Sequence, residues 1–328
     1  MSGLARAAKG AARRLAGILP RRPRPAILMY HRIAHETFDP WGLAVQEAVF
    51  AEQLEWLAAY RDVMPLAAFA ERQRDGRLPG TAISLTFDDG YACSLRTAAP
   101  LLARLGLPAT IFLPAELIQR GGEFWWDELA RVILEFEGGA LRLGNEETPV
   151  PARDPSDHDW SPGAPPKTPR QRLFLALWSR LRTMRPIELD ATMSEFRDQA
   201  VTQTTPRKAY RPLSPAEVRS ARSPGITFGS HALTHPSLPA LDESGKAREI
   251  GESRARCEAL TGAIPSAFAY PYGDVDGASL RLVKDAGFDC ACSTKGAFVG
   301  RRTDSFALPR LQVGNWDLRR FTDRLAGR

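Results

Sequence analysis

The sequence contains little cysteine. Only four of the 328 residues are cysteines, namely Cys93, Cys257, Cys290 and Cys292, and no two of them have C-x-x-C spacing. Cys290 and Cys292 stand two apart in an apolar run, so on a strand they would point the same way, a geometry that does not suit a bond between them. We therefore expect all four to be small buried hydrophobic residues, which favours a reduced, cytoplasmic setting.

The sequence also lacks long apolar runs. No stretch approaches the roughly 18 apolar residues of a membrane-spanning helix. Near the N-terminus the longest uncharged run, Leu15 to Pro20, is too short for the apolar core of a secretory signal, so we expect none. No Cys/His finger, basic region with heptads or aromatic RNA-binding signature is present, which argues against a nucleic-acid partner.

Positive charge is in excess, with a formal net charge of +6, and much of it lies in an N-terminal arm, residues 1–25. The arm also carries an alanine-rich, weakly apolar stripe at helical spacing. This combination predicts weak contact with an anionic membrane and a peripheral place at the inner membrane face. A solvated basic tail is the alternative. The basic residues are Arg6, Lys9, Arg13, Arg14, Arg21, Arg22 and Arg24.

Short apolar runs alternate with helical patterns along residues 26–328, which we take as one domain. The strand-like runs are Ala26 to Tyr30, Ala82 to Phe87, Ala109 to Leu113, Ile226 to Gly229, Ala267 to Tyr270, Phe288 to Ser293 and Leu308 to Val313. The helical patterns are Val45 to Tyr60, Ser94 to Leu105, Ser244 to Thr261 and Ala278 to Ala286. This alternation predicts an α/β fold with a parallel sheet, either a barrel or an open sheet.

One region, 121–215, interrupts this alternation and shows no strand signal. It opens with the aromatic segment Phe124-Trp125-Trp126 and continues into a helical pattern. A Pro-rich polar segment follows over 149–169, and a second helical pattern runs from Arg170 to Arg182. We predict a mostly helical insertion that caps the main domain.

Two adjacent carboxylates follow the apolar run Ala82 to Phe87, in the segment Thr86-Phe87-Asp88-Asp89-Gly90. Paired carboxylates are costly to bury unless a cation balances them. In α/β barrels and open parallel sheets, sites are built at the carboxyl ends of the strands. The segment therefore predicts a cation site, although Asp-Asp-Gly alone could form a simple turn.

Two histidines, His231 and His235, follow the apolar run Ile226 to Gly229. Residues four apart lie on one face of a helical turn, and an imidazole pair of this kind suits zinc and neighbouring first-row ions. Alone they could be ordinary loop residues, but the chain has only five histidines and an acidic partner is available. We predict a metal site.

The combination of motifs resembles the polysaccharide deacetylases that share a domain with the rhizobial chitooligosaccharide deacetylase. Thr86 to Gly90 is similar to the first motif of that family, and Ser230 to His235 to its histidine motif. Tyr270-Pro271-Tyr272-Gly273 resembles its third motif. The resemblance covers roughly 26–113 and 223–313, and it implies a distorted (β/α)7 barrel interrupted by the helical insertion.

The resemblance also implies roles for individual residues. Asp89, His231 and His235 would bind one divalent metal ion, with Zn²⁺ favoured and Co²⁺, Ni²⁺ or Fe²⁺ as alternatives. Asp88 would act as the general base, and the backbone N–H of Tyr272 would face the developing oxyanion. Two imidazoles and one carboxylate leave open positions on the ion, as a catalytic site requires.

The sequence departs from the family pattern at two positions. Ala269 stands where the third motif usually has an arginine that orients the base, and no histidine follows His235 to serve as the usual general acid. Arg310 is the best replacement for the arginine, with an ordinary surface arginine as the alternative. His31 is the best replacement for the acid, because Tyr30-His31 resembles the segment that opens the exopolysaccharide deacetylase subset of the family. A loop histidine with a local role is the alternative.

The function expected from this resemblance is removal of N-acetyl groups from N-acetylhexosamine units of a poly- or oligosaccharide, in cell-envelope or exopolysaccharide biosynthesis. Trp125, Trp126 and Tyr272 could offer ring faces to the sugar, although the tryptophans could instead pack the insertion on the barrel. One alternative is a deacetylase or deformylase of a lipid-linked sugar. Another is a non-catalytic glycan-binding module that keeps the fold.

Overall fold

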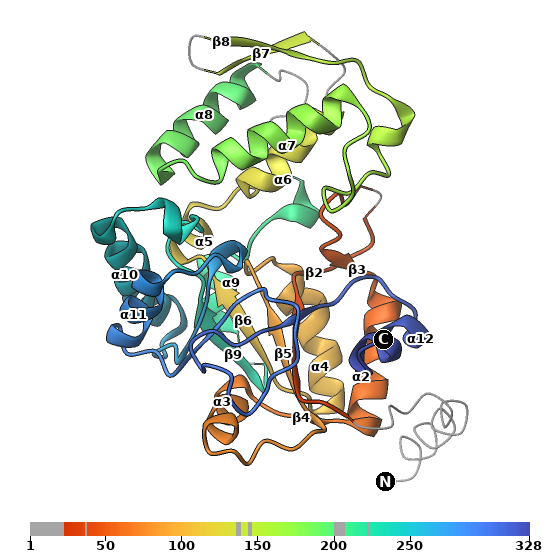
Figure 1. Ribbon diagram of the computed structural model, residues 1–328, viewed down its shortest axis with the longest axis vertical. Coiled ribbons are helices and arrows are strands. Elements are labelled where there is room, and N and C mark those ends of the chain that lie inside the picture. The colour runs from red at the N-terminus through yellow and green to blue at the C-terminus, as the bar shows by residue number, and fades with distance from the viewer. Residues whose placement is uncertain (1–22, 37, 136–138, 144–145, 200–206, 222) are drawn as a thin grey trace.

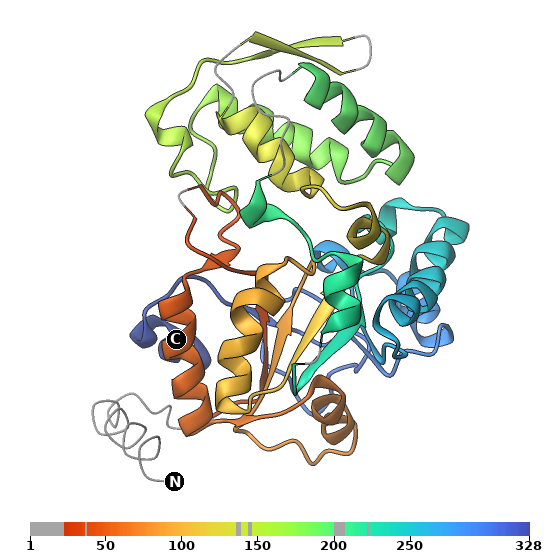
Figure 2. The same ribbon diagram turned by 180° about the vertical axis from the view of Figure 1, so that it is seen from behind.

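A computed structural model describes residues 23–36, 38–135, 139–143, 146–199, 207–221 and 223–328. The chain forms a barrel of parallel strands surrounded by helices, and the insertion lies above one end of that barrel (Figures 1 and 2). The basic N-terminal segment 1–22 lies outside the described residues. No helix in the described part of the chain is both long and apolar enough to span a membrane.

The barrel is built from parallel strands whose side chains are largely buried. Their order in the sheet is β11-β10-β9-β6-β5-β1-β12, and a short strand β4, Asp62–Val63, pairs with the start of β5. Residues of parallel strands that are covered on both faces are apolar without alternation, which is why these runs were visible in the sequence. The strands are β1 Ala26–Tyr30, β5 Ala82–Phe87, β6 Ala109–Leu113, β9 Ile226–Ser230, β10 Ala267–Ala269, β11 Cys290–Cys292 and β12 Leu311–Gln312.

The last segment of the sheet joins its two edges. Leu308 pairs with Cys292 of β11 in a parallel bridge, and its N–H donates to the carbonyl of Ala291 at 2.8 Å. Three residues later, Leu311 of β12 pairs with Leu28 of β1. The sheet therefore closes through one short segment, and the predicted distorted (β/α)7 barrel is confirmed over the open-sheet alternative.

Helices surround the barrel at the places where helical periodicity was seen, with several short ones added. A left-handed glycine, Gly106 with φ 66°, ends α4 as expected for a helix stop. The helices are α2 Glu47–Tyr60, α3 Leu66–Arg74, η1 Ser94–Ala98, α4 Ala99–Leu105, α5 Ala115–Arg120, α9 Pro215–Ser220, η5 Leu238–Ala240, α10 Glu243–Thr261, η6 Pro271–Gly273, α11 Gly277–Asp285 and α12 Leu318–Leu325. Two further short strands, β2 Arg32–Ile33 and β3 Ala44–Val45, pair with each other above β1.

The insertion is mostly helical and has an apolar core of its own, which includes Leu129, Phe174 and Phe196. The expectation that it contains no strand was wrong, because β7 and β8 form an antiparallel ribbon at its outer edge (Figure 1). In this ribbon Leu141 and Val150 are buried, and its other side chains give too little alternation to be recognised. Its elements are α6 Trp125–Ala130, η2 Arg131–Glu135, β7 Gly139–Leu143, β8 Glu146–Val150, η3 Pro155–Asp157, α7 Pro169–Leu181, α8 Pro186–Gln199 and η4 Lys208–Tyr210.

A buried polar network around Asp127 connects the insertion to the barrel. The hydroxyl of Tyr91, next to β5, donates to Asp127 Oδ2 at 2.6 Å and accepts from Trp126 Nε1 at 2.9 Å. Arg207 donates to the Asp127 carbonyl at 3.1 Å and forms an ion pair with Glu123 at 2.9 Å. Burial raises the pKa of the Asp127 carboxyl to about 7.

Because of this raised pKa, the protonation of Asp127 makes the stability of the protein depend on pH. Between pH ~4 and ~7 the folded protein keeps a proton on Asp127, whereas the unfolded chain has released it. The free energy of unfolding of the wild type therefore falls as the pH rises through this range. Asp127→Asn removes the titration but keeps an amide oxygen for Tyr91. We expect the free energy of unfolding of the variant, relative to wild type, to increase by up to roughly 4 kcal/mol between pH 4 and pH 7. Urea unfolding at both pH values measures this change, and a difference that does not vary with pH would contradict it.

Candidate active site

Two pairs of polar residues meet at the carboxyl end of the barrel. Asp88 and Asp89 follow β5, and His231 and His235 follow β9. Both strands pair with β6, and the N–H of His231 donates to the carbonyl of Leu113 at the end of β6 at 2.9 Å. Because parallel strands end at one edge, segments 142 residues apart in the sequence form one site.

The backbone around the site is strained. Among the described residues, four that are not glycine have positive φ, and all four belong to the segments around the two motifs and the Pro271–Gly273 turn: Asp89 at 66°, Ala232 at 63°, His235 at 59° and Tyr272 at 58°. Non-glycine residues in this region cost energy and persist where the surrounding structure enforces them. Their concentration here is typical of a functional site.

Asp89, His231 and His235 could hold one metal ion. Their ligand atoms all lie within 4.8 Å of one another, and all three side chains are buried. Asp89 Oδ1 is 3.5 Å from His231 Nε2 and 3.4 Å from His235 Nε2. Two ligands of a tetrahedral ion at about 2.1 Å lie about 3.4 Å apart, so the donor set and its spacing fit a zinc-like ion.

Hydrogen bonds with Ala269 and Glu249 fix the position of the histidine segment. His231 Nδ1 lies 2.7 Å from the carbonyl of Ala269, which assigns the proton to Nδ1 and leaves Nε2 free to bind a metal. The buried carboxylate of Glu249 accepts from the backbone N–H of Leu233 at 2.9 Å and of Thr234 at 3.0 Å. Sequence reasoning missed Glu249, because a single glutamate inside a charged helix has no distinguishing pattern.

Asp88 is paired with Arg310 rather than with the histidines. The guanidinium of Arg310 donates twice, at 2.6 Å to Oδ1 and at 2.7 Å to Oδ2, and its Nε donates to the Ser293 carbonyl at 2.9 Å. Arg310 is fully buried. A bidentate contact of this kind fixes the orientation of the carboxylate and keeps it ionised. The structure thus brings Arg310 to the carboxylate that its predicted role requires.

The electrostatics of the cluster favour charged carboxylates and one neutral histidine. Burial alone would raise the pKa of Asp88, but Arg310 and His231 outweigh it and hold that pKa well below its usual range. The pKa of Asp89 is also lowered, because contact with His231 and His235 outweighs its burial. Burial and the neighbouring His231 lower the pKa of His235 to about 3, so that His235 is neutral near pH 7. A neutral imidazole is the form that binds metals.

These residues line a cavity of about 280 Å³ at the carboxyl end of the barrel. His31, which directly follows β1, lies in this cavity with Asp88, Asp89, His231 and His235. Tyr272 and Trp126 form part of the wall, and the Trp126 and Tyr272 rings contact the His235 ring with centroids 4.5 and 4.6 Å away. The lining residues that were not among the predicted site residues are Met29, Trp41, Leu43, Trp178, Arg182, Thr294 and Gln312.

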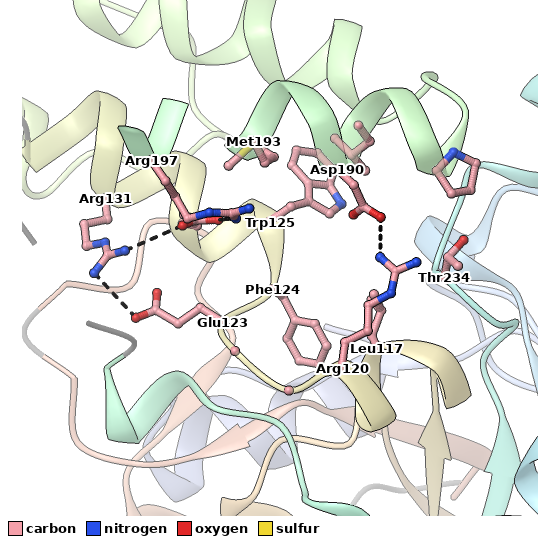
Figure 3. Close-up of a pocket in the computed structure, with 15 residues that line it drawn as sticks. Leu117, Arg120, Glu123, Phe124, Trp125, Arg131, Asp190, Met193, Arg197 and Thr234 are labelled. Atoms are coloured by element: carbon pink, nitrogen blue, oxygen red, sulfur yellow. Dashed lines mark hydrogen bonds and ion pairs between the residues drawn. The ribbon is translucent and has the colours of Figure 1, made fainter. Parts of the chain in front are cut away.

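The two tryptophans predicted to face the sugar are separated by the structure. Trp126 lines the site, but Trp125 faces a second cavity of about 380 Å³ beside Met193 and Asp190 (Figure 3). Consecutive residues on a helix point about 100° apart, so the two rings leave the helix in different directions. Trp125 is therefore not among the residues that line the cavity with Asp88, and its contact with the sugar stays a prediction. At the mouth of the second cavity, Arg120 of α5 pairs with Asp190 of α8 (Figure 3).

Comparison with known sequences places this site in a family context. The sequence profile of the polysaccharide deacetylases matches residues 75–136 and 187–291, which together make up half of the chain. YxkH of Bacillus subtilis (strain 168), named as a candidate polysaccharide deacetylase, is 33% identical over 89 residues, which are 26% of this chain. The match spans only 30% of that relative's length.

Solved structures share the fold at low sequence identity. The Streptococcus pyogenes deacetylase PplD, in complex with acetate, has a TM-score of 0.56 at 15% identity, over 90% of this chain and 94% of that chain. A de-N-acetylase from Aggregatibacter actinomycetemcomitans has a TM-score of 0.53 at 14% identity, over 89% of this chain and 95% of that chain. Both likenesses extend over nearly the whole chain and therefore include the region of the insertion.

Proposed function

This chain belongs to the polysaccharide deacetylase family, and we propose that it hydrolyses the acetamide of N-acetylhexosamine units in a poly- or oligosaccharide. The observation that carries the proposal is the arrangement of one carboxylate, Asp88, held by Arg310 beside a second carboxylate that faces two histidines. A binding module needs no oriented, ionised base next to a metal site. The PplD structure with acetate, and the de-N-acetylase with the same fold, add support.

Each residue of the site has a separate role in the proposed amide hydrolysis. A divalent ion held by Asp89, His231 and His235, which we propose to be Zn²⁺, would polarise the acetyl carbonyl and lower the pKa of a water. Asp88, kept charged by Arg310, takes a proton from the attacking water. The backbone N–H of Tyr272 faces the developing oxyanion.

The test of this proposal is acetate release from N-acetylated chito-oligosaccharides by the metal-loaded protein, measured together with its metal content. Metal binding without acetate release from any N-acetylated sugar would favour the alternative of a non-catalytic glycan-binding module.

His31 is the group that we propose protonates the leaving amine. It lies in the cavity with Asp88, and an amine is a poor leaving group unless it gains a proton. We expect His31→Ala to retain metal and to lower turnover of acetamides by roughly 10²–10⁴-fold. Hydrolysis of an activated acetyl ester should fall much less, because its leaving group needs little protonation.

The exposed His35, four residues away, provides the matched control. His35→Ala should leave hydrolysis of both substrates close to wild type. Equal losses on amide and ester in His31→Ala would show that His31 has a structural or binding role instead.

A further inference from the structure

The turn that carries Tyr272 is strained and lies directly against the barrel. Tyr272 has a φ of 58°, and the next residue, Gly273, has a φ of 74°. A Cβ on Gly273 would collide with the side chain of Thr294, so the close approach requires glycine at this position. Thr294 Oγ1 also donates to the Tyr272 carbonyl at 3.0 Å. The barrel thus supports the turn from one side, and a strained turn of this kind persists only where its surroundings enforce it.

The insertion contacts the ring of Tyr272 through the end of α7. The guanidinium of Arg182, the residue after α7, lies 5.2 Å from the centroid of the Tyr272 ring and 4.8 Å from that of the Trp178 ring. The Trp178 ring meets the Tyr272 ring edge to face, with centroids 6.0 Å apart. Cation–π and edge-to-face contacts are both attractive. The insertion therefore holds the ring of the residue whose backbone N–H is proposed to face the oxyanion.

An ion pair connects Arg182 to the residue that follows the turn. Arg182 Nη2 donates to Asp274 Oδ2 at 2.5 Å, and the hydroxyl of Ser237 donates to the same oxygen at 2.6 Å. Ser237 stands two residues after His235 in the histidine segment. Both side chains of the ion pair are only 25% exposed, so water screens the pair less than it screens a surface pair. Asp274 therefore joins the turn to the insertion on one side and to the histidine segment on the other.

We propose that Arg182 is a positioning residue for the turn that carries Tyr272, and that it makes the insertion a part of the active site. Its contacts with the Tyr272 ring and with Asp274 fix the turn in the conformation in which the Tyr272 N–H faces the oxyanion. A hydrogen-bond donor that is aligned before the reaction stabilises the oxyanion better than one that must move into place. The inference rests on the proposed deacetylation and assigns the insertion a role in it.

The kinetic test uses the zinc-loaded protein with two substrates, an N-acetylated chito-oligosaccharide and an activated acetyl ester. We expect Arg182→Gln to lower kcat by about ten- to a hundredfold on both substrates, because both reactions form an oxyanion. KM and zinc content should stay close to wild type, because an interaction made only in the transition state affects kcat. Asp274→Asn should give a similar loss, and the double variant should lose no more than the larger single loss, because both changes break one ion pair. Arg182→Lys, which keeps the positive charge beside Asp274, should recover part of the turnover.

The matched control is Arg185→Gln, which breaks an ion pair with Glu188 on the surface of the same insertion, where the Arg185 side chain is 72% exposed. Its kcat and KM should stay close to wild type on both substrates. Thermal unfolding identifies the variants that are folded at the assay temperature. If Arg182→Gln is not folded there, Asp274→Asn provides the same test from the other side of the ion pair.

The outcomes separate a positioning role from its alternatives. A raised KM with unchanged kcat in Arg182→Gln would assign Arg182 to sugar binding and overturn the positioning role. Additive losses in the double variant would overturn it as well. A wild type that hydrolyses the ester but releases no acetate from any N-acetylated sugar would contradict the proposed deacetylation. A lowered kcat for the ester in Arg182→Gln, with KM unchanged, would still support the positioning role in that case.

Discussion

Replacing His231 by alanine is expected to remove the bound metal and to abolish acetate release, with the fold retained. His231 provides one of three ligand atoms that lie within 4.8 Å of one another, and its Nδ1 contact with Ala269 aims Nε2 at Asp89. Losing one of three protein ligands leaves too few to hold a divalent ion tightly. Elemental analysis, acetate release and circular dichroism measure the three parts of this expectation.

The matched control for His231 is His158→Ala, because His158 lies on the insertion and its side chain is 46% exposed. It should retain both metal and activity. Removing the metal from wild type with a chelator should reproduce the loss in His231→Ala, and adding Zn²⁺ should restore only the wild type. Full metal occupancy in His231→Ala would show that the ion is bound elsewhere.

Asp88→Asn is expected to retain the metal and to lose roughly 10²–10⁴-fold in turnover, the usual contribution of a general base. Asparagine keeps the size of the side chain but cannot accept the proton. It also leaves the buried Arg310 facing a neutral amide, and breaking a buried pair of this kind typically costs about 3–5 kcal/mol of stability. Turnover is therefore measured under conditions in which thermal unfolding shows that the variant is folded.

Arg310→Lys separates charge from orientation at the same pair. Lysine keeps the positive charge next to Asp88 but cannot donate to both carboxylate oxygens in a fixed fork. We expect the loss of one charged hydrogen bond to lower turnover on the order of ten- to a hundredfold, less than in Asp88→Asn. Near-normal turnover in Asp88→Asn would rule out the base assignment, whatever the result with lysine.

Local patterns in the sequence were sufficient to predict the main strands of the barrel and the candidate metal ligands. The runs of the main parallel strands were visible, because strands covered on both faces are continuously apolar. These strands are β1, β5, β6, β9, β10, β11 and β12. Asp88, Asp89, His231 and His235 were visible because each pair directly follows such a run. The ribbon β7–β8 was missed, because among its described side chains only Leu141 and Val150 are buried, which gives no alternating apolar pattern.

The sequence by itself determined the fold class, the four residues at the carboxyl ends of β5 and β9, and Arg310 and His31 as candidates. Only the tertiary structure decided that the sheet closes through Leu308, that Arg310 meets Asp88 across 222 residues, and that Trp126 lines the cavity with Asp88. The reason is physical. Strands and metal motifs arise from neighbours along the chain and repeat at fixed spacings, whereas closure, ion pairing and cavity walls depend on distances between segments that share no local pattern.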